Sequence, residues 1–576
     1  MVASNVDRLR FWTHAVILGG AVLSAGLPIS TAVSAASDSP LLAGRITSTD
    51  GKPVAGVPVR AHRDNSSITV SAYTNVRGEY SFPDWSQLTP GLYSVAVEVA
   101  DFTPLAREAV MLSAGKTTQV NLTMKARKPT IADATVGEIV GAMPGTEDQK
   151  FLLSQCGQCH SIQLALKNAR NRDGWLQIVR RMAGARRAAE DPPGTRAFDQ
   201  KRFIEPTADY LASIRGLGSS AELPFQFRPR PVGEASTRLL VTEFEIPRGG
   251  KRDLFITRGD RRFAWPHDVA IDPNGRYVWY TDHFTDILGR LDRKTGEVKE
   301  FNFVPPPRDR GGRTDSDDSL GPQDGRAGEP GGGSHKITLA PDGNLIIGTG
   351  GGTVGFNTRT EAFKTWPNGS VMFAVDTAGN VWYLDRALHR LDLKTGDVKT
   401  YPAPPYAGGY DVDIDSRGRF VYNGWRTGKM GVFDPETEQF TEYQVPTPGS
   451  GPRRGEFDAT DRYWFSLYWA GRLAMIEPAS GNIREFSLLP DTKPFGYPYL
   501  APYTASVDDK NQLVWTTDLN SARIYRFDMK TERFTEYFMP VPFELRDLTV
   551  DRFADRPTVW LPAYRPQSKI VKVEVW

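Results

Sequence analysis

This 576-residue chain is poor in cysteine and histidine and has no large excess of either charge. It contains 2 cysteines and 7 histidines, and its 70 lysines and arginines nearly balance 68 aspartates and glutamates. A balanced charge does not indicate binding to nucleic acid or to an anionic membrane surface. Two cysteines allow one disulfide at most, so each cysteine and each histidine can be considered singly.

Long apolar runs are also scarce, and the one substantial run lies near the N-terminus. Arg8 and Arg10 precede "AVILGGAVLSAGL" (15–27), and small residues follow in "AVSAAS" (32–37). This order is typical of an export signal, so we predict a signal peptide over residues 1–36. The run is short for a membrane span, although an uncleaved anchor is the alternative. We expect a periplasmic or secreted protein without a stable membrane span after cleavage.

The residues that are abundant indicate a β protein of several domains. The chain has 54 glycines, 42 prolines and 11% aromatic residues, a mixture that suits strands joined by tight turns. It is too long for a single hydrophobic core. We therefore predict a mainly β, multidomain protein, with three zones of different composition after the signal.

Both cysteines fall in the pentapeptide "CGQCH", as Cys156 and Cys159, directly before His160. A disulfide across this spacing would be strained, and a redox-active dithiol is the alternative. The following histidine favours a third interpretation, in which both thiols form thioethers with haem and His160 ligates the iron. The motif predicts one covalently bound haem c.

The zone around this motif, residues 131–217, has helical periodicity. In "WLQIVRRMAG", the residues Trp175, Ile178, Val179 and Met182 fall on one helical face, and "PTADYLASIRG" (206–216) reads as a closing helix. With its haem motif, the zone resembles a small α-helical class I cytochrome c domain.

The second axial ligand of the haem iron has to come from elsewhere in the zone. Met182 is the one methionine that follows the motif before the propeller, and no histidine lies in this interval. We predict His160 and Met182 as the axial ligands. The alternatives are that Met182 only fills the core, that Met143 ligates the iron, or that an open iron site serves a sensor or a peroxidase.

The zone over residues 41–126 alternates apolar and polar positions between turn signals. Its segments "GRITSTDGKPVAGVPVRA", "TNVRGEYSF" and "LTPGLYSVAVEVADF" resemble the carboxypeptidase regulatory-like domain. This resemblance implies a transthyretin-like β-sandwich used for docking and says little about activity.

One unit repeats through the third zone, residues 237–576. Each copy reads as four strands, with an Asp/Gly turn after the first and a Thr/Gly turn after the third, as in a propeller blade. The copies span 267–301, 335–366, 371–401, 410–443, 457–486, 503–537 and 546–576. The last copy lacks its outer strand, and "LLVTEFEIP" (239–247) resembles the outer strands "FTEYQVP" and "FTEYFMP". We therefore predict a seven-bladed β-propeller closed by an N-terminal strand.

A Gly/Pro-rich, charged insertion, 304–334, separates the first two blades and is predicted to be flexible, either as a tolerated insertion or as a lid.

The blade pattern, "WYTD" followed by "ILGRLD", "TGEVKEF" and their equivalents, resembles the streptogramin lyase (virginiamycin B lyase) family. That resemblance implies a histidine at a strand entry with two glutamates near it. His267 matches the histidine, but Trp265 occupies the position of the first glutamate. Asp282 lies one residue after the position expected for the second glutamate. His335 is the candidate for the family's additional histidine.

Aligning the copies places a set of polar residues on one face of the propeller, at the strand entries and after the second strands. These residues are His267, Asp282, His283, His335, Tyr410, Tyr503, Asp518 and Arg546. We predict His267, Asp282 and His335 as catalytic residues and the others as the substrate face. His267, His335 and Asp282 also supply two nitrogens and an oxygen for a divalent metal. The alternative is that the aspartates only accept backbone N–H groups in turns.

Three functions follow from these motifs. The first is an exported electron-transfer protein, in which the propeller binds a redox partner or a small molecule that it oxidises, and the haem passes on the electron. The second is a C–O lyase or hydrolase like streptogramin lyase, with the haem domain for docking or sensing. The third is a non-catalytic binding scaffold. A fused haem favours the first, because a lyase needs no electrons.

Overall fold

The structure is a computed structural model, and it describes most of the chain beyond residue 40. The described ranges are 41–154, 162, 166–184, 200–219, 227–249, 262–306, 333–385, 387–405, 407–425, 427–490, 494–541, 544–564 and 567–576, with only the backbone of 181–184 and 200–202. The predicted signal peptide, Cys156, Cys159, His160, the Met182 side chain and most of the 304–334 insertion lie outside this description. Among the helices within these ranges, none is both long and apolar enough to cross a membrane.

The first described zone forms a β-sandwich around an apolar core. Its strands are β1 (Leu41–Ser48), β2 (Pro58–Arg63), β3 (Ile68–Tyr73), β4 (Glu79–Ser81), β5 (Gly91–Val97), β6 (Leu105–Leu112), β7 (Thr117–Gln119) and β8 (Leu122–Met124). One sheet contains β4, β1, β7 and β8, and the other contains β3, β2, β5 and β6. Alternate residues of β5, such as Val95 and Val97, are fully buried between the sheets. The predicted sandwich is confirmed.

The second zone is helical, as predicted. It contains η1 (Ile131–Asp133), α1 (Val136–Ala142), α2 (Glu147–Ser154), α4 (Arg172–Gly184) and α5 (Gln200–Ile214), and the short α6 (Glu234–Thr237) follows. Helices α4 and α5 pack together over a core that includes the buried Trp175 and Val179. The indole N–H of Trp175 donates to the carbonyl of Arg215 at 2.9 Å. Met143, at the end of α1, is 2% exposed in the same core. The haem motif lies outside the description, so the assignment of this zone to the cytochrome c class stays a prediction.

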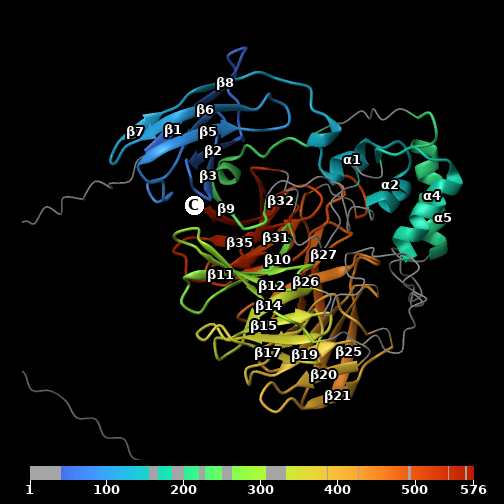
Figure 1. Cartoon of the computed structure of the whole chain (residues 1–576). Helices are drawn as coiled ribbons and strands as arrows, with labels where there is room; N and C mark the ends of the chain where they lie inside the picture. The colour runs from blue at the N-terminus through green and yellow to red at the C-terminus, as the bar shows by residue number, and fades with distance from the viewer. Residues whose placement is uncertain are drawn as a thin grey trace, which may run out of the picture. The chain divides into compact units, whose positions relative to one another are not determined.

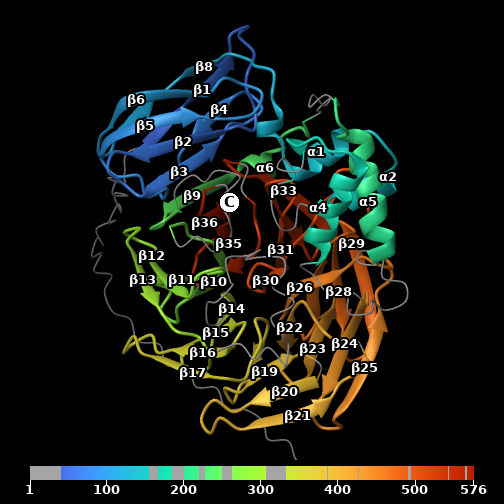
Figure 2. The same ribbon diagram turned by 45° about the vertical axis from the view of Figure 1, so that its right-hand side comes forward.

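The third zone is a propeller of four-stranded antiparallel sheets, in chain order from green to red in Figure 1. Blades one to three contain β10 (Pro266–Ile271), β11 (Tyr277–Asp282), β12 (Ile287–Asp292), β13 (Val298–Asn302), β14 (Ser334–Leu339), β15 (Leu345–Thr349), β16 (Gly352–Phe356), β17 (Phe363–Trp366), β18 (Ala374–Val375), β19 (Val381–Leu384), β20 (Ala387–Leu391) and β21 (Val398–Pro402). Blades four to six contain β22 (Val412–Ile414), β23 (Phe420–Gly424), β24 (Lys429–Asp434), β25 (Gln439–Gln444), β26 (Pro452–Phe457), β27 (Tyr463–Leu467), β28 (Arg472–Glu477), β29 (Asn482–Ser487), β30 (Ser506–Asp508), β31 (Leu513–Asp518), β32 (Arg523–Asp528) and β33 (Arg533–Phe538). The first strands of neighbouring blades contact one another around a common centre (Figure 2).

The seventh blade is completed by a strand from the start of the propeller. It contains β34 (Thr549–Val550), β35 (Thr558–Ala563), β36 (Lys569–Val575) and β9 (Leu239–Glu245). Strand β9 pairs antiparallel with β36 along its whole length. The predicted closure by the 239–247 segment is therefore confirmed, and it leaves no unpaired edge on β36.

The other edge of β9 pairs with β3, which joins the seventh blade and one sandwich sheet into a single eight-stranded sheet. At this junction Glu243 is fully buried. Its carboxylate accepts from the Arg60 guanidinium at 3.0 Å and from the Lys569 ammonium at 3.1 Å. The buried carboxylate of Glu243 thus forms ion pairs with Arg60 of the sandwich and Lys569 of the propeller.

Replacing Glu243 with alanine should destabilise the chain by about 3–5 kcal/mol, because two cations lose their buried partner. Glu245 lies on the same strand but is 58% exposed, so Glu245→Ala is the matched control and should cost less than about 0.5 kcal/mol. Chemical denaturation of both variants measures the difference. Equal midpoints for the two variants would show that the buried ion pairs of Glu243 contribute no stability.

Candidate functional site

The candidate site is built where the first strands of three blades depart from regular pairing. The register shifts between Pro266 and Val269 in β10, between Ser334 and Ile337 in β14, and between Pro452 and Gly455 in β26. A β-bulge of this kind re-aims side chains and is common beside active sites. The residues within the three shifts are His267 with Asp268, His335 with Lys336, and Arg453 with Arg454.

Polar side chains of the preceding blades hold these strand entries in place. The Thr281 hydroxyl donates to the carbonyl of His335 at 2.7 Å, and the Asn423 amide donates to that of Arg453 at 2.5 Å. The Thr517 hydroxyl donates to the carbonyl of Arg546 at 2.5 Å. Each hydrogen bond runs from one blade to the next, so contacts between neighbouring blades fix the backbone of the strand-entry residues.

Three histidines converge at this centre. The ring centroids of His267 and His335 are 3.8 Å apart, and His283 lies 4.6 Å from His267 and 4.9 Å from His335. One nitrogen from each ring lies within 4.8 Å of the other two. We call these residues the three-histidine cluster. Its members come from β10, from the loop after β11 and from β14.

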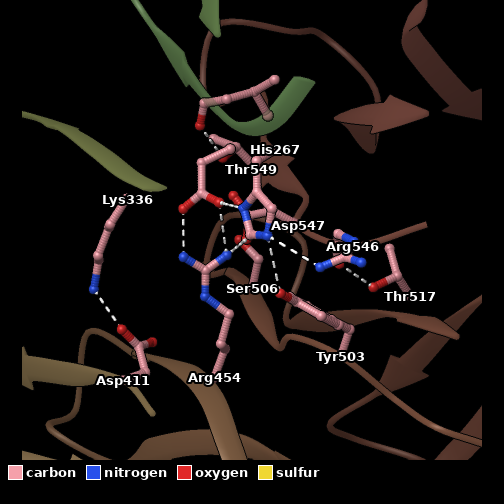
Figure 3. A network of polar contacts seen from close by, with 12 residues as sticks. His267, Lys336, Asp411, Arg454, Tyr503, Ser506, Thr517, Arg546, Asp547 and Thr549 are labelled. Carbon is pink, nitrogen blue, oxygen red and sulfur yellow. Dashed lines mark hydrogen bonds and ion pairs between the residues drawn. The ribbon is translucent and has the colours of Figure 1, made fainter. Parts of the chain in front are cut away.

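The imidazole of His267 is oriented by a buried ion-pair network (Figure 3). Its Nδ1 contacts the carboxylate of Asp268, which also accepts from the Arg454 guanidinium at 3.0 Å. Arg454 in turn lies 3.1 Å from the carboxylate of Asp547. His267, Asp268 and Arg454 are all at most 2% exposed. A carboxylate on one imidazole nitrogen is the usual support of a metal-binding histidine.

The two other histidines differ in their surroundings. His283 Nδ1 lies 3.0 Å from the hydroxyl of Tyr564. His335 is 9% exposed, and its buried Nδ1 has no hydrogen-bond partner among the described residues. Burial, reinforced by the neighbouring His267, lowers the pKa of His335 well below 6.5. His335 is therefore neutral, and it holds an unpartnered nitrogen inside the cluster.

Tyrosines and arginines form the wall beside the cluster. The Tyr503 hydroxyl lies 3.1 Å from His267 Nε2 and 2.6 Å from the hydroxyl of Tyr410. Burial would raise the pKa of Tyr410, but the Arg453 guanidinium, with Arg454 and Arg546, outweighs it and lowers that pKa below 10. Burial raises the pKa of Tyr503, so this pair favours negative charge on the oxygen of Tyr410, whose ring centroid lies 6.2 Å from that of His335.

The propeller axis also contains a cavity of about 450 Å³. Its charged lining comes from the first strands and includes Asp268, Lys336, Asp411, Asp413, Arg454, Glu456 and Asp547. Lys336 donates to Asp411 at 2.8 Å. Burial, with Asp268 nearby, raises the pKa of Asp547 to about 8, and burial raises the pKa of Asp413 to about 7. The cavity is thus lined by the Asp268–Arg454 pair and by carboxyl groups that can exchange protons near neutral pH.

The cluster has the composition of a metal site built from imidazoles alone. Metal–nitrogen distances of about 2.1 Å in tetrahedral geometry place ligand nitrogens about 3.4 Å apart. The nitrogens lie within 4.8 Å of one another, so the rings have to shift when a metal binds to reach this geometry. Three imidazoles suit zinc, copper, iron or nickel rather than magnesium or calcium.

Two of the three predicted catalytic residues meet in this cluster, and His283, predicted for the substrate face, is its third member. The carboxylate of Asp282 instead accepts from Arg248 at 2.9 Å, and Arg248 also binds Glu300. Of the remaining face residues, Tyr410, Tyr503 and Arg546 surround the cluster.

Asp518 has the turn-forming role that was the alternative for the aspartates. Its carboxylate accepts from the backbone N–H groups of Ala501 at 2.8 Å and Asn520 at 3.0 Å. Its side chain therefore fixes the local chain path rather than facing the cluster.

Sequence reasoning missed the aspartates that follow the strand-entry residues. A signal was present in the repeats "HDVAID", "YDVDID" and "RDLTVD", where Asp268, Asp411 and Asp547 occupy the same place in three blades. All three line the axial cavity. An aspartate that recurs in otherwise apolar inner strands indicates that charged side chains line the propeller axis.

Comparisons with known proteins find similarities in two parts of the chain. Among solved structures, a streptogramin B lyase is similar over 60% of this chain and all of its own length, with 17% identity and a TM-score of 0.45. An inactive H270A virginiamycin B lyase from Staphylococcus aureus with quinupristin is similar over 59% of this chain and all of its own, with 18% identity and a TM-score of 0.44.

The TonB-dependent transporter Oar of Myxococcus xanthus is 34% identical over 125 residues, which is 22% of this chain. The match spans only 11% of the length of that relative. Residues 42–125 match the family model of the carboxypeptidase regulatory-like domain.

Proposed function

We propose that this chain is an exported c-type haem protein whose propeller binds a redox-active metal at the three-histidine cluster and exchanges electrons there with a small molecule or a partner. The observation that carries the proposal is the convergence of His267, His283 and His335, with ligand nitrogens within 4.8 Å of one another.

The haem part of the proposal rests on the donor set in the sequence. Cys156, Cys159 and His160 have the spacing for two thioethers and an axial imidazole. The helices before and after them, α2 and α4, belong to one domain with a common core. Bound in this way, haem supplies a one-electron acceptor and donor, and Met182 is the proposed second axial ligand.

The surroundings of the cluster define what each side chain does there. Asp268 contacts Nδ1 of His267 and orients its ring, and the Arg454 guanidinium holds Asp268 in turn. His335 offers a neutral, unpartnered nitrogen. Tyr503 places a hydroxyl 3.1 Å from His267 Nε2, where it can donate to an oxygen of a bound molecule. Arg453 and Arg546 favour a molecule that carries negative charge.

Localisation outside the cytoplasm agrees with two observations. The first 36 residues have the order of an export signal. A protein named as a TonB-dependent transporter is 34% identical over 125 residues. We propose that the sandwich serves as a docking module for this exported protein.

An equilibrium copper titration tests the proposed function. Full-length protein made in a host that matures c-type haem is mixed without oxygen, either as ferric protein with copper(I) or as ferrous protein with copper(II). Both directions should reach one redox equilibrium, with an end point of one copper per chain. His335→Ala should no longer show this saturable end point. A haem spectrum unaffected by bound copper would exclude electron exchange between the two sites.

A further inference from the structure

We propose that the axial cavity of the propeller binds a small organic diamine, with its two ammonium groups at Asp413 and Asp547. The cavity is separate from the three-histidine cluster, since none of the three histidines lines it. It is lined by the parts of β10 and β14 that follow the cluster histidines, 268–271 and 336–339. Binding of a ligand there requires neither the metal nor the haem.

The cavity has more acidic than basic side chains. Its basic residues are Lys336, Arg454 and Arg552. Its acidic residues are Asp268, Asp411, Asp413, Glu456 and Asp547. Five carboxylates would therefore face three cations, and charges removed from water need partners of opposite sign. A ligand with two positive charges makes the lining neutral.

The three cations are already paired with particular carboxylates. The distances are 2.8 Å for Lys336 to Asp411, 3.0 Å for Arg454 to Asp268, and 2.6 Å for Arg552 to Glu456. Figure 3 shows Lys336 directed at Asp411 across the axis. These pairs leave Asp413 and Asp547 as the carboxyl groups without a cation of their own.

The surroundings of these two carboxyl groups favour an additional cation. Asp413 accepts from the backbone N–H of Ile414 at 2.9 Å and forms no ion pair with a side chain of the described residues. Asp547 shares Arg454 with Asp268, at 3.1 Å. Burial raises the pKa of Asp413 to about 7 and, with Asp268 nearby, that of Asp547 to about 8. In the empty cavity both groups are thus partly protonated at neutral pH, and an ammonium group replaces the proton.

Thr504 adds a polar group without a partner. It belongs to the cavity lining and is 4% exposed, and its hydroxyl has no hydrogen-bond partner among the described residues. Buried hydroxyl groups are rarely left without a partner in proteins. The Thr504 oxygen is therefore available to accept a hydrogen bond from an ammonium group in the cavity.

The arrangement of the carboxyl groups favours an organic cation over a single metal ion. Within the described ranges, the three histidines are the one group of side chains close enough together to share a metal ion. Separated carboxyl groups instead suit two charges joined by a chain, and apolar residues such as Ile337 and Leu548 in the lining suit its methylene groups.

The size and position of the cavity also suit a small molecule. Its volume of about 450 Å³ lies within the roughly 300–1,000 Å³ of small-molecule sites. Phe553 lines the cavity and is 54% exposed, as is the Arg552 side chain at 71%. These exposed residues place one end of the cavity at the protein surface, where a ligand can enter.

Calorimetric titration of the full-length protein with 1,4-diaminobutane at pH 7 tests the proposal. One diamine should bind per chain, and butylamine should bind at least about tenfold more weakly, because it lacks the second ammonium group. The net charge of the chain is +2, so non-specific attraction of the diamine to the surface is not expected.

Asp413→Asn should also weaken diamine binding at least about tenfold. Asparagine has the shape of the protonated acid, so the variant should keep its fold. Asp397→Asn is the matched control, because Asp397 is an exposed propeller aspartate outside the cavity lining, and it should bind the diamine as the wild type does.

Proton release provides a second measurement. Titrations at pH 7 in two buffers of different ionisation enthalpy should show about one proton released per diamine, because the bound ammonium groups keep Asp413 and Asp547 ionised. Equal affinities for Asp413→Asn and the wild type, or no binding of the diamine, would overturn the proposal. Saturable binding of calcium without binding of the diamine would also overturn it and assign the cavity to a metal ion.

None of these results depends on copper or haem, so they leave the proposed function to its own test.

Discussion

We expect a chain in which Cys156 and Cys159 are both replaced by serine to be exported without any covalently bound haem. The two residues are the only cysteines of the chain, so no other thiol can replace them. In the wild type, denatured protein should retain the haem absorbance and show the added mass of one haem. In the double variant both signals should be absent, because serine does not form the thioether bonds.

The single variants separate haem attachment from a redox-active dithiol. Cys156→Ser and Cys159→Ser each leave one thiol, so either protein should retain haem through one thioether, in lower yield. A dithiol would instead leave the wild type colourless and give two free thiols after reduction. Colourless wild-type protein from a host that matures other c-type cytochromes would contradict haem attachment.

The second large effect is expected at the three-histidine cluster. His335→Ala should weaken copper or zinc binding at least about 100-fold, because losing a ligand costs more than the 10–100-fold typical of changing a residue that only supports a ligand. His389→Ala is the control, because this propeller histidine pairs with Asp385 and stacks on Tyr383, away from the cluster. Competition with a chromophoric chelator measures both affinities.

Asp268→Asn adds an intermediate case to this series. Asparagine keeps the size of the side chain but removes the charge that Nδ1 of His267 contacts. Metal affinity should fall about 10–100-fold, between the effects of the control and of His335→Ala. Equal affinities for the wild type and both cluster variants would place the metal elsewhere.

The architecture was predictable because its signals are local or repeat along the chain. The Asp/Gly and Thr/Gly turns recur in each blade, and the 239–247 segment resembles the other outer strands. Its pairing with β36 confirmed that reasoning. The pairing of β9 with β3 was not predicted, because edge-to-edge contact between two domains has no local signature in either strand.

The candidate site was predictable only in part. His267 and His335 occupy equivalent repeat positions, and this equivalence places them together. His283 lies beside them, whereas the Asp282 carboxylate accepts a hydrogen bond from Arg248. Arg248 lies outside the repeats, so the aligned copies could not show this pairing. Nor could they show the β-bulges that turn both His267 and Asp268 toward the axis.

X-ray absorption at the edge of the bound metal, in copper-loaded full-length protein, identifies the atoms that bind the metal. We expect three imidazole nitrogens at about 2.0–2.1 Å from the metal, and one imidazole fewer in His335→Ala. A shell dominated by carboxylate oxygens, or one that is unchanged in His335→Ala, would contradict a metal site at His267, His283 and His335.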